Sequence, residues 1–454
     1  MNAHVRQILS AVQCQYEEFP YPPVSSLEEE DPLRNLHASF NHDLALVGEE
    51  RLTPASTIWV PGCGTRWAVM TALQFKDVQI IASDLSNASL ELQRRIARSL
   101  NITNIEFRQE NLLEVSYNQA FDFVSCVGVL HHLPNPQAGF ELIARSLKKS
   151  GTAEIMVYDR ANRQHSIRMQ HILRVLDPDC RLSAPERFEL ALSILRAANT
   201  HTDRPRELDR VLKLVESSPD FRRELADFIS HPQENYYDVV SLVSALSEAG
   251  LTPRSWKMPY LFDPQLLLPD PVLQPILAKL HATDRAQLGY LLSSWLLEVF
   301  VRHQDGEAPQ RTTPHLHGST KLREIASTTI YRFNPDGEMI GHEARSKMAI
   351  RDGNLWIDAG ERRPAVSAFG RAIDCVLEHP RRLLSLSEFG FETSLSTAEV
   401  LKLVELARST RTIDEMADAL QAEAGPARII HRKDVLAVCE HLVRPPFRIL
   451  ALAE

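Results

Sequence analysis

A short apolar strand that ends in a glycine turn and leads into a helix most constrains the fold of this chain. Residues 58–61 are apolar and partly β-branched, Gly62-Cys63-Gly64 follows at once, and Trp67–Phe75 is compatible with a helix. Glycine at positions 62 and 64 permits positive φ and lets a ligand approach the backbone without an intervening Cβ atom. The N–H groups that open the following helix would face this ligand. The stretch predicts a nucleotide-binding turn.

An acidic residue follows at the spacing that nucleotide-binding units use. The second expected strand, Val78–Asp84, ends 22 positions after Gly62, where such units place the acceptor for ribose hydroxyl groups. The dinucleotide fingerprint needs a third glycine where this chain has Trp67, and no Gly-Lys-Ser/Thr of a phosphate-binding loop follows. A cofactor with adenosine and no phosphate fits better, which indicates S-adenosylmethionine.

Strands and helices are expected to alternate between residues 56 and 160, which predicts an α/β fold with a parallel sheet and right-handed crossovers. The expected strands are Thr57–Pro61, Val78–Asp84, Ile105–Gln109, Phe121–Val127 and Ala153–Tyr158. The expected helices are Trp67–Phe75, Ala88–Leu100, with Ser86 as its cap, and Gln137–Leu147. Ligands of such sheets bind at the carboxyl ends of the strands.

Three further strand ends therefore carry candidate residues. Asn111 follows the third strand and is either a reader of the adenine edge or a turn residue. The fourth strand ends near Val127 and is followed by His131 and His132, and the fifth ends at Tyr158.

Charge and cysteine usage exclude several classes of partner. Over 454 residues the net charge is −9, which disfavours duplex nucleic acid and anionic membranes. The six cysteines form no Cys-x-x-Cys pair, so we expect neither a zinc site nor a disulfide framework. The N-terminus lacks the pattern of a signal peptide, and no apolar run is long enough for a membrane helix. We expect a cytoplasmic protein of two or three domains.

Five motifs together resemble one known family. They are Tyr16–Pro22 (YEEFPYP), Gly62–Thr65 (GCGT), Asp84–Leu90 (DLSNASL), Gly128–Leu133 (GVLHHL) and Tyr158. With these motifs, residues 15 to 304 resemble a bacterial group of class I S-adenosylmethionine-dependent methyltransferases.

The resemblance implies a Rossmann-like, seven-stranded core and a set of cofactor contacts. These contacts are Tyr21, Pro61, Gly62, Cys63, Gly64, Arg66, Asp84, Leu85, Asn111, Leu112 and Val127. Two positions depart from the family pattern: Arg66 replaces a usual glycine, and Pro61 stands where an acidic residue is common. The substrate is not implied.

The expected domains are a lead-in and cofactor strap at 1–50, a methyltransferase domain at 51–304, a linker at 305–318, and an accessory domain at 319–454. Residues 160–230 are expected to form a helical insertion, which is either a lid that shapes the substrate pocket or a plain packing layer. Its expected helices are Ser166–Leu176, Pro185–Ala198, Pro205–Glu216 and Phe221–Ser230. A strand at Leu251–Leu261, a helix at Pro275–Ser294 and a last strand at Leu297–Arg302 would complete the core.

We expect the accessory domain to be a small α+β module, for which a winged-helix-like fold is one option. Capping boxes at Ser396-x-x-Glu399 and Thr412-x-x-Glu415 predict two helix starts. Its 19 Lys and Arg against 20 Asp and Glu lack the basic footprint of a DNA-binding module. A protein or peptide partner, or self-association, is the better interpretation.

The catalytic candidates are His131, His132 and Tyr158. Neutral imidazole is a competent base near neutral pH, so either histidine could take a proton from the methyl acceptor. Both histidines are alternatively strand and helix caps, and many methyltransferases need no base. His165 and His171 are secondary candidates. No metal site is expected, since His315-x-His317 has no third ligand nearby.

Three functions are consistent with this combination of motifs. The first is methyl transfer to an O or N atom of a small molecule or peptide. The second is a non-catalytic or regulatory binding protein with a retained methyltransferase core, which Arg66 and Pro61 motivate. The third, RNA methylation, is disfavoured by the net charge and by the absence of an Asn/Asp-Pro-Pro-Tyr motif.

Overall fold

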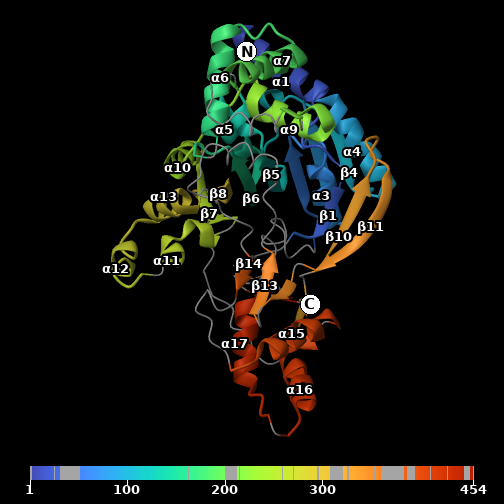
Figure 1. Ribbon diagram of the computed structural model, residues 1–454, viewed down its shortest axis with the longest axis vertical. Coiled ribbons are helices and arrows are strands. Elements are labelled where there is room, and N and C mark those ends of the chain that lie inside the picture. Colours follow the sequence, from blue (N-terminus) through green and yellow to red (C-terminus); the bar gives the residue numbers. More distant parts are fainter. Residues whose placement is uncertain are drawn as a thin grey trace.

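The fold is organised by a seven-stranded sheet in the order β4-β3-β2-β5-β6-β8-β7 (Figure 1). Its strands are β2 Thr57–Pro61, β3 Gln79–Asp84, β4 Ile105–Gln109, β5 Phe121–Val127, β6 Leu147–Val157, β7 Leu251–Trp256 and β8 Leu297–His303. The computed structural model describes residues 3–24, 26–30, 52–161, 163–199, 212–213, 215–257, 259–268, 270–293, 296–306, 321–324, 327–346, 348–351, 354–358, 383–385, 394–409, 411–426, 428–443 and 450–452.

The central strands are buried on both faces, as expected of a parallel sheet covered by helices. In β2, residues 58–61 are all buried, and Trp59 stacks on Phe121 of β5 with ring centroids 5.2 Å apart. The strands between residues 56 and 160 pair parallel, as predicted, whereas β8, beyond that stretch, runs antiparallel to both β6 and β7. The reason is that the chain leaves β7 and re-enters the sheet at the same end.

Helices cover the sheet, and most begin at side-chain caps. They are α3 Trp67–Gln74, α4 Asn87–Ser99, α5 Pro136–Ser146, α10 Val239–Glu248, α11 Pro264–Leu267, α12 Gln274–Leu277 and α13 Ala282–Ser293. The predicted cap Ser86 is confirmed, because its side chain accepts from the Ser89 backbone N–H. Asp238 and Ser241 form a capping box at the start of α10.

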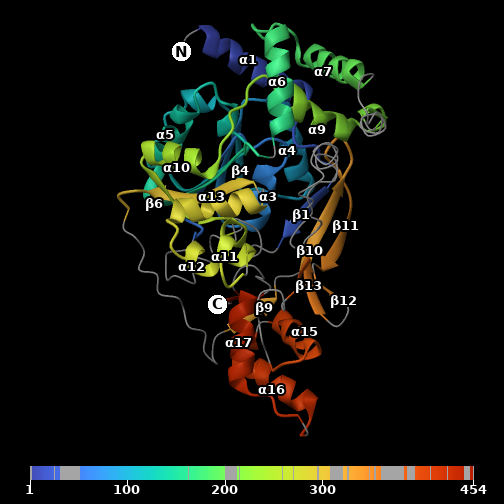
Figure 2. The same cartoon turned by 60° about the vertical axis from the view of Figure 1, so that its left-hand side comes forward.

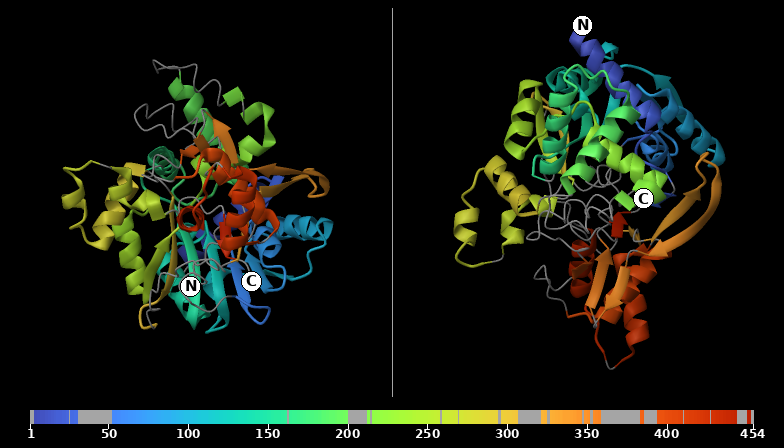
Figure 3. Two further views of the ribbon diagram at one scale, coloured as in Figure 1. Left: turned by 90° about the horizontal axis from the view of Figure 1, so that it is seen from below. Right: turned by 45° about the horizontal axis from the view of Figure 1, so that its top comes forward.

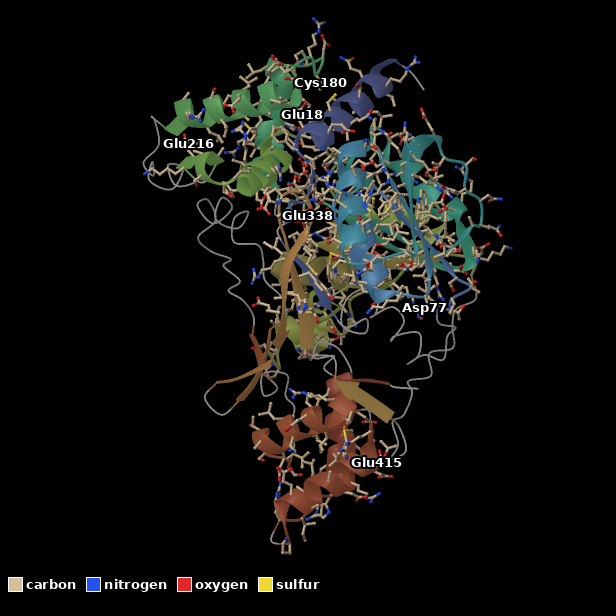
Figure 4. The ribbon with its side chains drawn as sticks, turned by 90° about the vertical axis from the view of Figure 1, so that its right-hand side faces the viewer. Glu18, Asp77, Cys180, Glu216, Glu338 and Glu415 are labelled. Carbon is tan, nitrogen blue, oxygen red and sulfur yellow. The ribbon has the colours of Figure 1, made fainter. Side chains whose placement is uncertain are left out.

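A separate helical layer lies over the carboxyl ends of the strands (Figure 2). It consists of α1 Ala3–Glu18, α6 Gln164–Leu176, α7 Ala184–Asn199 and α9 Pro219–Ser230. These helices share a hydrophobic core in which Phe19 contacts Phe188 with ring centroids 5.7 Å apart. Figure 4 shows Glu18 and Cys180 of this layer at the end of the sheet opposite Asp77, which precedes β3.

The N-terminal lead-in and a C-terminal hairpin meet in a second, three-stranded sheet. Strand β1 Ser26–Glu30 pairs antiparallel with β10 Ser327–Phe333, and β10 pairs with β11 Met339–Ser346. The turn of the hairpin meets α4 (Figure 3, right), where Arg95 Nε donates to the Asp336 carbonyl at 2.7 Å. Sequence patterns did not predict this pairing, because strands 300 positions apart leave no local signal.

The C-terminal residues form helices α15 Thr397–Leu406, α16 Ile413–Ala424 and α17 Arg432–Val443 (Figure 1). Both predicted capping boxes are confirmed, at Ser396 with Glu399 and at Thr412 with Glu415. Short strands accompany the helices: β9 Lys321–Glu324, β12 Met348–Arg351, β13 Asn354–Asp358, β14 Leu383–Ser385, β15 Arg411–Thr412 and β16 Leu450–Leu452.

Two predicted elements have different bounds in the structure. The helix expected at Pro275–Ser294 is interrupted between α12 and α13, since Leu280 N–H bonds to the Leu277 carbonyl in a tight turn. The strand expected at Leu251–Leu261 ends at Trp256. Most of the helix expected at Pro205–Glu216 lies outside the described residues. Of the helices in the described part of the chain, none has both the length and the apolar character to cross a membrane.

Candidate functional site

The predicted glycine turn is present between β2 and α3. Gly62 and Gly64 have φ of +58° and +57°, a region that favours glycine. A Cβ atom on Gly62 would lie 2.4 Å from Cγ2 of Val129, and one on Gly64 would lie 2.7 Å from the Tyr21 carbonyl oxygen. Both positions therefore require glycine for conformation and for space. Gly62 also brings the turn against the segment that follows β5.

Asp84 lies directly beside this turn at the carboxyl end of β3. Its Oδ2 accepts from Gly64 N–H and its Oδ1 accepts from Ser86 N–H, both at 2.8 Å. Burial, only partly offset by these bonds, raises the pKa of the Asp84 carboxyl to about 6. Gln93, which sequence reasoning missed, donates from its side chain to the carbonyls of Cys63 (3.1 Å) and Gly64 (2.7 Å).

The N-terminal segment predicted as a strap lies over the turn. Thr65 N–H donates to the Tyr21 carbonyl at 3.2 Å, and the Thr65 hydroxyl donates to the Pro22 carbonyl. Glu17 caps the start of α4, accepting from the N–H groups of Asn87 (2.7 Å) and Ala88 (3.1 Å). The strap thereby joins α1 to both helix starts that border the glycine turn.

The remaining predicted cofactor contacts also lie at strand ends. Pro61 ends β2, Val127 ends β5, and Arg66 is the first residue before α3. Asn111 follows β4 and accepts from Leu113 N–H at 3.1 Å, so it caps the short turn that begins at Leu112. Asn111 was expected either to read the adenine edge or to act as a turn residue, and this bond shows the turn role.

Leu85 follows Asp84 and is held by its backbone. Its carbonyl accepts from the side chains of Gln13 (3.2 Å) and Gln109 (3.3 Å). The first of these bonds comes from α1 and the second from the end of β4. The acidic strand end is thus fixed from two sides.

A buried group of polar side chains, which we name the polar chamber, adjoins the glycine turn. Its residues come from the ends of β5 and β6, from α1 and α9, and from the segments next to α6 and α9. They are Tyr16, His131, His132, Tyr158, Arg163, Asp227, His231 and Glu234. The three predicted catalytic candidates are therefore brought together.

Aromatic contacts hold the histidines of the chamber. The His131 ring stacks on Tyr158 with centroids 3.8 Å apart, and the His132 ring lies 3.9 Å from that of His231. Tyr16 of α1 approaches His132 edge-on at 6.0 Å. The two predicted histidines directly follow Val129 and Leu130, so the chamber begins two residues after the contact with Gly62.

Two carboxyl groups and one guanidinium complete the chamber. Asp227 accepts from the Tyr158 hydroxyl at 3.0 Å and from the Tyr16 hydroxyl at 3.3 Å. Arg163 lies 3.9 Å from both Asp227 and Glu234, and its Cζ is 3.4 Å from the Tyr158 ring centroid. The two acids therefore share one cation.

Burial controls protonation in the chamber. Desolvation lowers the pKa of His132 to about 3 and those of His131 and His231 well below the ordinary value, so all three are neutral near pH 7. Desolvation also raises the pKa of Asp227 and raises that of Glu234 to about 7, against the attraction of Arg163. The chamber thus offers neutral hydrogen-bonding groups with few fixed charges.

One part of the chamber has the residue types of a metal site. Ligand atoms of His132, Asp227 and His231 lie within 4.8 Å of one another. Two features oppose a divalent cation there: the Arg163 guanidinium is 3.9 Å from Asp227, and Nδ1 of His231 is already occupied as an acceptor from Gln233 N–H at 3.2 Å. The geometry favours a polar organic ligand over a metal.

Sequence reasoning missed the contributions of the helical layer. They are Arg163, Asp227, His231 and Glu234, which lie 99 or more positions after Gly64 and outside the motifs that identified the turn. His171 is exposed on α6. The side chain of His165 lies outside the described residues.

Comparisons with known proteins agree with this geometry. Residues 57–183 match a family model described as a methyltransferase domain. The uncharacterized protein syc1184_c of Synechococcus is 27% identical over 249 residues, which are 54% of this chain and 59% of that protein. A ubiquinone biosynthesis O-methyltransferase of Acinetobacter baumannii is 25% identical over 120 residues, covering 25% of this chain and 50% of its own. The chain thus spans about half the length of these curated relatives.

Solved structures share the fold over nearly the whole chain. PKMT2 from Rickettsia typhi in complex with AdoHcy has a TM-score of 0.55 at 15% identity, covering 96% of this chain and 76% of that one. Another structure of PKMT2 gives a TM-score of 0.53 at 14% identity, over 90% and 74%. Residues 57–183 therefore match a methyltransferase domain, and the chain shares the Rossmann-like fold of PKMT2, whose structure with AdoHcy supports S-adenosylmethionine as the cofactor.

Proposed function

We propose that the chain is an S-adenosylmethionine-dependent methyltransferase that transfers a methyl group to an O or N atom of a small molecule or peptide. One observation carries the proposal: the glycine turn that would cradle the cofactor contacts Val129, and the polar chamber begins two residues later at His131. Cofactor and acceptor would thus meet across a single, continuous buried site.

The burial of the chamber supports a narrow acceptor group. His131 is fully buried and Tyr158 is 6% exposed, so a bulky surface could not reach them without rearrangement. A small molecule, or one extended side chain of a peptide, fits this depth. The imidazole, tyrosine and carboxyl groups of the chamber would hold such a group by hydrogen bonds, and these bonds strengthen when water is excluded.

The cofactor contacts follow from the cradle. Asp84 would accept from the ribose hydroxyl groups, and the positive-φ glycines would let the methionine part pass close to the backbone. The strap at Tyr21 and Pro22 would close over it. Asn111 and Leu112 would border the adenine ring.

We further propose that the C-terminal region, residues 319–454, binds a protein partner or a second copy of the chain. The shared fold with PKMT2 extends over this region, which supports an integral role for it. The hairpin β10–β11 lies on α4 and pairs with β1, so whatever binds there could also influence the strap that follows α1.

A non-catalytic or regulatory binding protein is the second candidate. It is favoured by Arg66 in place of a usual glycine and Pro61 in place of an acid. Such a protein would bind the cofactor in the same cradle without turning it over.

Titration calorimetry and a turnover assay separate the two candidates. The native protein should bind S-adenosylmethionine and AdoHcy with micromolar affinity, Asp84→Ala should lose this binding, and Asp77→Ala, an exposed acid at the opposite end of the sheet, should retain it. Methyl transfer is then followed with radiolabelled cofactor on a pool of lysine-containing peptides and on catechol. Binding without turnover on any acceptor would favour the regulatory candidate, and no binding would overturn both.

A further inference from the structure

The three histidines of the polar chamber differ in which ring nitrogen carries hydrogen. Nδ1 of His132 lies 3.0 Å from the carbonyl oxygen of Gln233. Because a carbonyl oxygen can only accept, this Nδ1 is the donor and carries the hydrogen. The backbone N–H of the same Gln233 donates to Nδ1 of His231 at 3.2 Å, so that nitrogen presents its lone pair. One residue thus fixes opposite tautomers in two adjacent rings.

His131 has the tautomer of His231. Its Nδ1 accepts from the backbone N–H of Tyr158 at 3.2 Å. Burial keeps all three rings neutral, and a neutral imidazole carries one N–H only. His131 and His231 therefore present Nε2–H donors, whereas His132 presents Nε2 as an acceptor.

The Nε2 atoms of all three rings are buried and lack a hydrogen-bond partner in the described part of the chain. A buried polar atom without a partner costs about 1–3 kcal/mol, so three in one chamber indicate a place for a polar ligand. Only one of the three could take a proton from that ligand.

We propose that His132 is the proton acceptor of methyl transfer, that His131 and His231 donate hydrogen bonds to the acceptor molecule, and that the methylated atom carries a removable hydrogen. This inference rests on the proposed function and narrows it to hydroxyl groups and to primary or secondary amines. Tertiary amines and thioethers, which have no such hydrogen, are excluded as substrates.

The step balances with the groups at hand. When bound, S-adenosylmethionine supplies a methyl group on a sulfonium sulfur. The acceptor atom forms a bond to the methyl carbon, the carbon–sulfur bond breaks with its electron pair going to sulfur, and the proton of the acceptor moves to Nε2 of His132. His132 becomes a cation, and the substrate leaves in its methylated form.

Nearby charges bear on the cation that His132 becomes. The carboxyl of Asp227 lies within 4.8 Å of a ligand atom of His132 and would stabilise it. Burial opposes the cation most strongly, and Arg163 adds like-charge repulsion. The titratable groups that surround His132 from neighbouring elements are Tyr16, His131, Tyr158, Arg163, Asp227, His231 and Glu234.

The tautomers can be measured without an acceptor. Protein labelled with ¹⁵N-histidine gives long-range proton–nitrogen correlations that distinguish Nδ1–H from Nε2–H rings, and single His→Asn variants assign them. We expect Nδ1–H at His132 and Nε2–H at His131 and His231. A protonated Nε2 on His132 would overturn the proposal.

The variant His132→Asn tests the catalytic role. An asparagine amide can still donate to the Gln233 carbonyl, so the fold is preserved while the Nε2 acceptor is lost. We expect kcat on the best acceptor of the peptide and catechol panel to fall at least about tenfold; the full ~10²–10⁴ belongs to a base matched to the operating pH, and burial lowers the pKa of free His132 to about 3. AdoHcy affinity should not change. The control His281→Asn, at an exposed position, should keep full activity.

The pH profile separates a base from a structural residue. The rate of His132→Asn should rise with pH where the native profile is flat, because solvent hydroxide replaces the lost base. A native enzyme that turns over while His132→Asn loses less than tenfold, or keeps the native pH profile, would refute the inference and leave the proposed function intact. No turnover by the native protein would overturn the proposed function and this inference together.

Discussion

Replacement of Gly62 by alanine tests the contact that joins the glycine turn to the polar chamber. An alanine at φ +58° costs about 1–3 kcal/mol of backbone strain. Its Cβ would also lie 2.4 Å and 2.8 Å from the two γ-carbons of Val129, and overpacking of this kind costs about 1–3 kcal/mol more. We expect Gly62→Ala to lower the free energy of unfolding by about 2–6 kcal/mol.

A second glycine provides the matched control. Gly250 has φ of +77°, and a Cβ atom there would meet nothing within 4 Å. Gly250→Ala should therefore cost only the backbone strain, about 1–3 kcal/mol. The difference between the two variants isolates the collision with Val129.

Urea unfolding followed by circular dichroism measures both variants, together with Val129→Ala and the double variant Gly62→Ala/Val129→Ala. Truncation of Val129 removes both colliding carbons, so the double-mutant cycle should show a favourable coupling of about 1–3 kcal/mol. Equal losses for Gly62→Ala and Gly250→Ala, with no coupling to Val129, would show that the side chain of Val129 does not collide with a Cβ atom at position 62.

Three further predictions concern the borders of the site. AdoHcy affinity should fall as the pH drops through about 6, where Asp84 gains its proton, and calorimetry on Asp84→Asn should show no such dependence. The folded-state pKa of Asp84 also lies above its ordinary value of 3.8. Its contribution to folding stability is therefore lost as the pH rises from about 4 through 6. Glu17→Gln removes a carboxylate that caps α4, worth about 0.3–1 kcal/mol, and should speed AdoHcy release in stopped-flow traces; an unchanged rate would contradict a strap role. Leu92→Asp should expose the hairpin that contacts this residue at Gly337, seen as faster hydrogen exchange across 327–346, whereas unaltered exchange would show that α4 does not hold it.

Local patterns in the sequence were sufficient for the glycine turn and the residues beside it. The glycine turn, the acid at position 84 and the capping serine at position 86 are each specified within a few residues, because φ, hydrogen-bond geometry and strand length are local constraints. The same holds for the capping boxes of α15 and α16.

Long-range contacts account for what the sequence did not reveal. The Tyr16 hydroxyl bonds to Asp227, 211 positions away, and no periodicity links α1 to α9. Arg163 belongs to no motif recognised in the sequence, yet its guanidinium lies 3.9 Å from the carboxyl groups of both Asp227 and Glu234. The reversed strand β8 and the pairing of β1 with β10 likewise depend on how distant segments meet.

We infer that one buried site holds the cofactor against β2 and β3 and opens its methyl end toward the chamber. A crystal structure with AdoHcy would show both ends of this site at once. We expect ribose hydroxyl groups within hydrogen-bond distance of Asp84 and the cofactor sulfur facing His132 and Tyr158. A sulfur that points away from the chamber, or AdoHcy bound without Asp84, would contradict it.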